Sequence, residues 1–145
     1  MNLMQRVAAI FGVAFLVAGA LGFTAAGASM HDMHTSMSAA PRLLGLFPVN
    51  VTHNAVHLAF GVWGIAAAFS RRQAGVYAMV SGVIYAALAG AGAFWPTLFG
   101  VVPIGGYDVG LHLVIALVLI GCTVYSATVE NDQLVTGTTT TSAGR

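Results

Sequence analysis

Long apolar runs without charge constrain the fold of this chain more than any other feature. They occupy residues 7–28, 51–69, 74–95 and 105–127. A helix needs about 20 predominantly apolar residues to cross a hydrocarbon core about 30 Å thick. Only 6% of the residues are charged, against about 25% in a typical soluble domain. The sequence therefore predicts one all-α domain, an integral membrane four-helix bundle.

The arginines indicate how such a bundle is oriented. Arg71 and Arg72 lie between the second and third runs, in a turn so short that these spans must form an antiparallel hairpin. In the four-span arrangement only Arg42 falls on the opposite side from the other arginines. Because positively charged loops stay in the cytoplasm, we expect both termini to be cytoplasmic and the loop at 29–50 to face outward. We expect a multi-pass membrane protein.

The two ends of the chain need separate interpretation. Residues 1–28 could instead form a cleaved signal peptide, with Ala26-Gly27-Ala28 as its cleavage site. The apolar run is longer than the usual signal core of about 7–15 residues, however, which favours a retained span. Residues 128–145 are polar and rich in threonine, and a segment of this kind buries too little apolar area to order itself. We expect a disordered cytoplasmic tail there.

An internal repeat relates the two halves of the bundle. The segment that starts at Gly12 (GVAFLVAGAL) and the one that starts at Gly75 (GVYAMVSGVI) share glycine and valine at the same spacing. The second and fourth spans share a [His/Asp]-x-x-x-His-Leu element, which begins at His53 and at Asp108. Since each copy contains two spans, both copies enter the membrane from the same side, which predicts two related helical hairpins in a parallel repeat.

Polar side chains gather near the outer ends of the second and fourth spans. They are His53, Asn54, His57, Asp108 and His112. Residues four apart share one face of a helix, and ionisable groups within a membrane normally face the bundle interior and pair with one another. Three interpretations stay open. The cluster could clamp the two helices through hydrogen bonds, with Asp108 and Asn54 orienting the histidines. It could bind a transition metal or a b-type haem through His57 and His112. It could also relay protons or a small solute.

The outer loop adds a second, weaker metal candidate in Met30, His31, Met33 and His34, because thioethers and imidazoles bind copper. Motifs of enzymes are lacking: we find no nucleophile paired with a base, no phosphate loop and no HExxH. The net charge of +1 argues against a nucleic acid partner. Cys122 is the only cysteine and lies in an apolar run, so we expect it to be an inert packing residue.

The motif Asn50-x-x-His53-Asn54-x-x-His57-Leu58, with the glycine-rich first span before it and Gly105-Gly-Tyr-Asp-Val-Gly-Leu-His-Leu after it, resembles a known family. This is the bacterial membrane family called domain of unknown function 4383, and the similarity covers residues 7–127. The resemblance implies a four-helix, multi-pass protein of the bacterial inner (plasma) membrane and no particular chemistry. We therefore expect a non-enzymatic structural or accessory subunit that contacts the lipid bilayer and either other membrane subunits or a second copy of itself. The alternative is a metal-, haem- or proton-binding or transport protein that uses the histidine and aspartate cluster.

Overall fold

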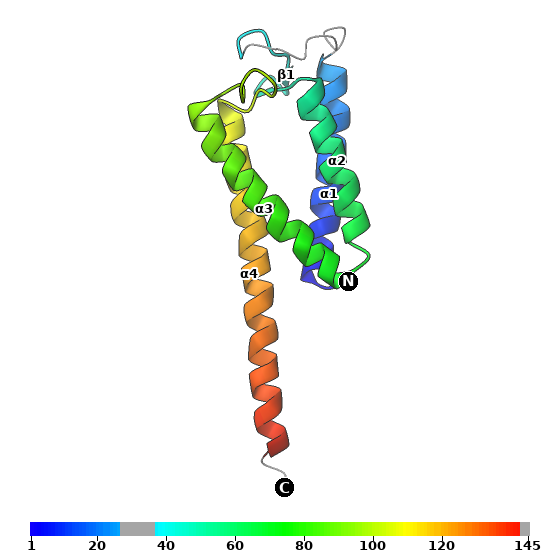
Figure 1. The fold of residues 1–145 in the computed structure, drawn as a ribbon. Helices are drawn as coiled ribbons and strands as arrows, with labels where there is room; N and C mark the ends of the chain where they lie inside the picture. Colours follow the sequence, from blue (N-terminus) through cyan, green and yellow to red (C-terminus); the bar gives the residue numbers. More distant parts are fainter. Residues whose placement is uncertain (27–36, 143–145) are drawn as a thin grey trace.

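Four α-helices make up the computed structural model, which describes the backbone of residues 1–26 and 37–142 and the side chains of residues 1–25 and 37–133. The helices are α1 (Leu3–Ala26), α2 (Val51–Ala67), α3 (Arg71–Phe94) and α4 (Tyr107–Ser142). Consecutive helices run in opposite directions, so the N-terminus and the far end of α4 lie toward the same end of the molecule (Figure 1). The prediction of an all-α fold with four helices is confirmed.

Of the helices that the structure describes, three are long and apolar enough to cross a membrane: Leu3–Ala25, Arg71–Phe94 and Tyr107–Gln133. The remaining helix, α2, has 17 residues and is therefore about 26 Å long at about 1.5 Å per residue. It ends at Ala67 rather than at residue 69 as the sequence predicted. Three spans of this kind make the chain a multi-pass membrane protein.

Polar caps explain why two helices begin earlier than the apolar runs do. At α1, the Asn2 side chain accepts a hydrogen bond from the Gln5 backbone N–H at 2.9 Å. The Gln5 side chain accepts one from the Asn2 N–H at 3.0 Å. This reciprocal capping starts α1 at Leu3. The Ser70 side chain caps α3 in a similar way by accepting from the Gln73 N–H, so α3 starts at Arg71 rather than at residue 74.

The helices pack in two antiparallel pairs, α1 with α2 and α3 with α4, and α1 contacts α3 between the pairs. Buried residues of both pairs, including Ala8, Phe15, Tyr77, Tyr85 and Leu119, form one apolar core. Large apolar side chains also cover the outside of the bundle; Ile10, Val62 and Leu117 are 66%, 62% and 64% exposed. Exposed apolar faces of this kind are suited to contact with lipid.

Glycine allows the paired helices to approach closely. A Cβ atom on Gly12 would lie 2.7 Å from the backbone nitrogen of Ile65, and one on Gly82 would lie 2.7 Å from the Ile120 side chain. A Cβ atom on Gly75 would meet nothing within 4 Å. Gly12 and Gly75, which the sequence analysis matched, therefore have unlike surroundings, whereas Gly82 makes a close contact like that of Gly12.

The loop before α2 contains a short antiparallel ladder that the sequence analysis did not predict. It pairs β1 (Arg42–Leu43) with β2 (Phe47–Pro48). The chain reverses through Leu44 and Gly45, which have positive φ angles of 55° and 74°. Glycine adopts such an angle without steric cost, which suits Gly45 to this turn.

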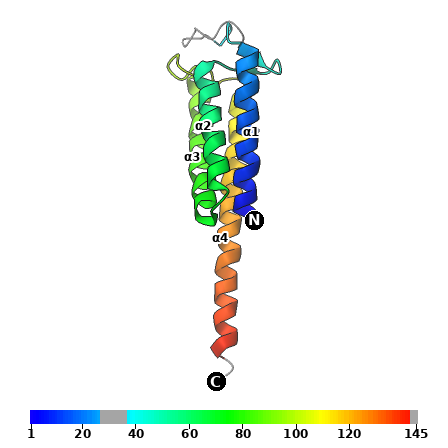
Figure 2. The same cartoon turned by 90° about the vertical axis from the view of Figure 1, so that its right-hand side faces the viewer.

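The polar tail differs from the prediction. α4 continues without a break to Ser142 in the structure, whereas the sequence analysis expected disorder from residue 128. Elongating an existing helix orders one residue for each hydrogen bond gained and avoids the unfavourable nucleation step. The apolar part of α4 supplies that nucleus. Figure 2 shows the resulting extension of α4 beyond the other three helices.

Candidate metal centre

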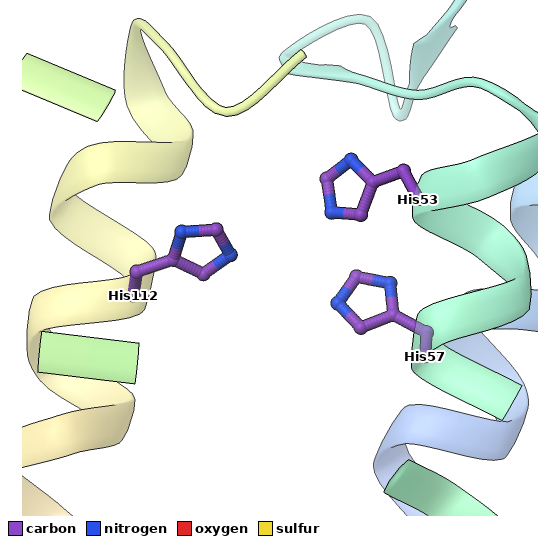
Figure 3. Close-up of side chains that lie close together, drawn as sticks. All are labelled: His53, His57 and His112. Atoms are coloured by element: carbon purple, nitrogen blue, oxygen red, sulfur yellow. The ribbon is translucent and has the colours of Figure 1, made fainter. Parts of the chain in front are cut away.

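Three histidines from two helices face one another near the end of the bundle where α2 and α4 begin. His53 and His57 lie one turn apart on α2, and His112 projects toward them from α4 (Figure 3). One ring nitrogen of each histidine lies within 4.8 Å of the corresponding atoms of the other two. Residues far apart in sequence thus present three imidazoles to a common point.

His53 is held in an orientation that leaves one nitrogen available. Its Nδ1 lies 3.2 Å from the carbonyl oxygen of Pro48. A carbonyl oxygen only accepts hydrogen bonds, so the tautomer with a proton on Nδ1 satisfies this contact, and that tautomer leaves the lone pair of Nε2 for a metal. Histidines that bind metals are commonly oriented by this kind of bond to a backbone carbonyl. The local fold explains the contact, because Pro48 ends β2 just before α2 begins.

Asp108 places a carboxylate beside the histidines. Its Oδ2 lies 3.6 Å from Nε2 of His53, and the residue is 2% exposed. Among the described residues, neither Asp108 Oδ2 nor His112 Nδ1 has a hydrogen-bond partner. An unsatisfied buried polar group costs about 1–3 kcal/mol, and a bound cation would remove that penalty at the carboxylate.

Aromatic rings support the cluster on its inner side. Phe15 of α1 stacks on His57, with ring centroids 5.6 Å apart, and on Tyr85 of α3, with centroids 5.1 Å apart. Tyr85 in turn contacts His112 at 5.1 Å between centroids. A small cavity of about 190 Å³ adjoins the rings of Tyr85 and the three histidines. The remaining lining is apolar, from Val56, Phe60, Ile84, Leu88, Leu98, Val102 and Ile104.

The size of this cavity distinguishes between a single metal ion and a haem group as its occupant. Pockets for small organic ligands have volumes of about 300 Å³ or more, and the cavity beside the histidines is smaller than that, at about 190 Å³. A porphyrin held by His57 and His112 would need more room than this cavity provides.

Asn54 does not take the role that the sequence predicted for it. Its side chain is fully buried but lies against Gly22 of α1, and neither of its amide atoms has a hydrogen-bond partner among the described residues. It therefore does not orient His57 or His112 by hydrogen bonding. Met30, His31, Met33 and His34 lie outside the described residues. Cys122 is a half-buried free thiol that packs against the core.

Asn50 positions the start of α2 next to the histidines, a role that the sequence analysis did not predict. Its side-chain oxygen accepts a hydrogen bond from the His53 backbone N–H at 2.8 Å and so caps α2. Its Nδ2 donates to the carbonyl oxygen of Val101 at 2.8 Å, which ties the loop before α4 to the start of α2. An asparagine just before an apolar helical run is a recognisable N-cap signal, so the first of these contacts could have been predicted.

Comparison with known proteins gives a family and no closer relative. No curated protein and no solved structure matches this chain. The family model described as Domain of unknown function (DUF4383) matches residues 5–125. The predicted resemblance is confirmed, and the chain belongs to this family.

Proposed function

We propose that this protein is a four-span protein of the bacterial inner membrane that binds one transition-metal ion near its outer face. The convergence of His53, His57 and His112 carries this proposal, because their ring nitrogens lie within 4.8 Å of one another. The proposed role is binding, without catalysis. Of the alternatives that the sequence left open, metal binding accounts best for three imidazoles beside a buried carboxylate.

The donor set favours a borderline metal such as Zn²⁺. Imidazole nitrogen suits zinc, copper, nickel and iron, whereas calcium and magnesium prefer oxygen ligands. Nitrogens bound at about 2.0–2.1 Å to one tetrahedral ion lie about 3.4 Å apart. The rings need only small side-chain rotations to reach that spacing from within 4.8 Å. Asp108 would occupy the fourth position or hydrogen-bond to a water molecule there.

The membrane placement rests on charge and on aromatic side chains. Arg71 and Arg72 lie at the turn between α2 and α3, which the positive-inside rule assigns to the cytoplasm. Trp95 and Tyr107, 54% and 68% exposed, lie at the opposite end, where amphipathic rings favour the interface. In this arrangement α2 also crosses the membrane, both termini are cytoplasmic, and the histidines face outward. In this proposal α1 stays in the mature protein and is not a cleaved signal peptide, because Phe15 of α1 supports the metal site.

A duplication would explain how the site is built. In our proposal α1 and α2 correspond to α3 and α4 as a parallel repeat, and corresponding residues support corresponding histidines. Phe15 stacks on His57 as Tyr85 contacts His112. The pairs that support this register are Gly12 with Gly82, Phe15 with Tyr85, Gly22 with Gly92, Pro48 with Pro103, His53 with Asp108, and His57 with His112.

Calorimetry tests the proposal directly. The full-length chain would be purified in mild detergent, stripped of metal and titrated with Zn²⁺. We expect one ion per chain, with stoichiometric binding lost in His57→Ala and in His112→Ala. The matched control is His31→Ala/His34→Ala in the outer loop, which should bind zinc as the unmodified protein does.

One outcome contradicts the proposal and favours the structural or accessory role. If the unmodified protein binds no zinc, and His57→Ala and His112→Ala only lower its stability, the cluster is a clamp between helices. Among the described residues no hydrogen bond joins His57 to His112, and Nδ1 of His112 has no partner, which favours metal binding over a clamp made by these two histidines.

A further inference from the structure

A second cavity lies at the opposite end of the bundle from the histidines. Its volume is about 570 Å³, and it is formed where the first residues of α1 and α3 face the middle of α4. Figure 1 shows the cause, since α3 diverges from α4 toward the N-terminal end of α1. Arg71 and Arg72 contribute to its wall from α3, and Ser126 and Glu130 contribute from α4.

The charge at this cavity is mainly positive and uncompensated. Among the described residues, no carboxylate lies within ion-pair distance of either arginine, and both side chains are exposed. Arg71 is also the first residue of a helix of 24 residues, whose N-terminal dipole favours an anion. Glu130 is the one acidic residue in the described wall, so the attraction for an anion exceeds the repulsion.

The rest of the wall suits the glycerol and acyl part of a lipid. Met4, Val76 and Val129 line the cavity beside the polar groups. Two candidate spans, Leu3–Ala25 and Arg71–Phe94, begin beside it, which places the cavity at the boundary between the hydrocarbon core and the cytoplasmic headgroups. Basic pockets between helices at this level bind the headgroups of anionic lipids.

We propose that this cavity binds the phosphate of an anionic phospholipid from the cytoplasmic leaflet, with Arg71 and Arg72 as the phosphate ligands. The apolar wall makes a lipid a better occupant than free phosphate, which shares the same phosphate chemistry. This site does not depend on the metal site, which lies at the other end of the bundle.

Native mass spectrometry of the full-length chain in mild detergent tests this site. Phosphatidylglycerol and phosphatidylcholine would be titrated separately. We expect tighter binding of phosphatidylglycerol, weakened about fivefold by removing one arginine and about 25-fold in Arg71→Gln/Arg72→Gln. Arg42→Gln, at the opposite end of the bundle, is the control that should leave the binding of both lipids unchanged.

A second variant separates lost binding from lost folding. Ser126→Leu would fill the cavity without changing its charge, and we expect it to weaken phosphatidylglycerol binding while circular dichroism shows unchanged helix content. Equal binding of the two lipids, or binding of phosphatidylglycerol that survives both variants, overturns the proposal. If inorganic phosphate binds in a manner that depends on the arginines, and neither lipid is preferred, the cavity is a phosphate site and a lipid is not its occupant.

Discussion

Replacing Gly12 by alanine tests the close contact between α1 and α2. The added Cβ would lie 2.7 Å from the backbone nitrogen of Ile65 and 3.0 Å from the carbonyl carbon of Gly64. These atoms belong to a helical backbone, which cannot rotate away as a flexible side chain does. Overpacking of this kind costs about 1–3 kcal/mol. Alanine also improves helix propensity by about 1 kcal/mol, so the net loss in Gly12→Ala is smaller than the steric cost.

Gly75→Ala is the matched control, because a Cβ at that position meets nothing within 4 Å. The propensity gain is the same in both variants and cancels in the comparison. We therefore expect Gly12→Ala to be less stable than Gly75→Ala by about 1–3 kcal/mol. The assay is reversible unfolding, in which SDS is titrated into protein in mild detergent and helix content is followed. Equal free energies of unfolding for the two variants would refute the packing described for α1 and α2.

The remaining predictions concern the region around the histidines. Asn50→Ala should lower the free energy of unfolding by about 1–2 kcal/mol, because it removes the cap of α2. The control, Asn131→Ala on the exposed part of α4, should change the free energy of unfolding little in the same SDS titration. Equal effects of the two variants would contradict the capping role of Asn50. Asp108→Asn should weaken zinc binding about 10- to 100-fold in calorimetry, with Glu130→Gln as the charge-matched control. Zinc affinity should fall as the pH is lowered, because each proton that an imidazole captures removes a metal ligand. A zinc affinity that stays the same in strongly acidic solution, where the imidazoles are protonated, would show that the histidines are not the ligands.

Much of the fold follows from elementary features of the chain. The long apolar runs predict the helices, and the arginine pair at 71–72 predicts the tight turn between α2 and α3. Spacing of four residues places His53 and His57 on one face of a helix. The shared element at Asp108 and His112 predicts a matching position on α4. These are local patterns, and local patterns determine where helices form and which faces carry polar groups.

Other features depend on the packing between helices, which the sequence pattern does not specify. Asn54 looked like a partner for the histidines, yet its side chain lies against Gly22, because the approach of α1 to α2 decides which face of α2 is covered. Gly75 matched Gly12 in sequence, although Gly82 occupies the comparable close contact. In apolar helices rich in glycine and valine, several alignments score alike, and only the contacts distinguish them.

The proposed metal site can be tested most directly by X-ray absorption spectroscopy of the zinc-loaded protein in detergent. Our account predicts one zinc per chain with three imidazole nitrogens at about 2.0–2.1 Å, and loss of the imidazole signal in His57→Ala/His112→Ala. A protein that retains no zinc, or zinc bound by sulfur or by oxygen alone, would contradict the assignment of His53, His57 and His112 as a metal centre.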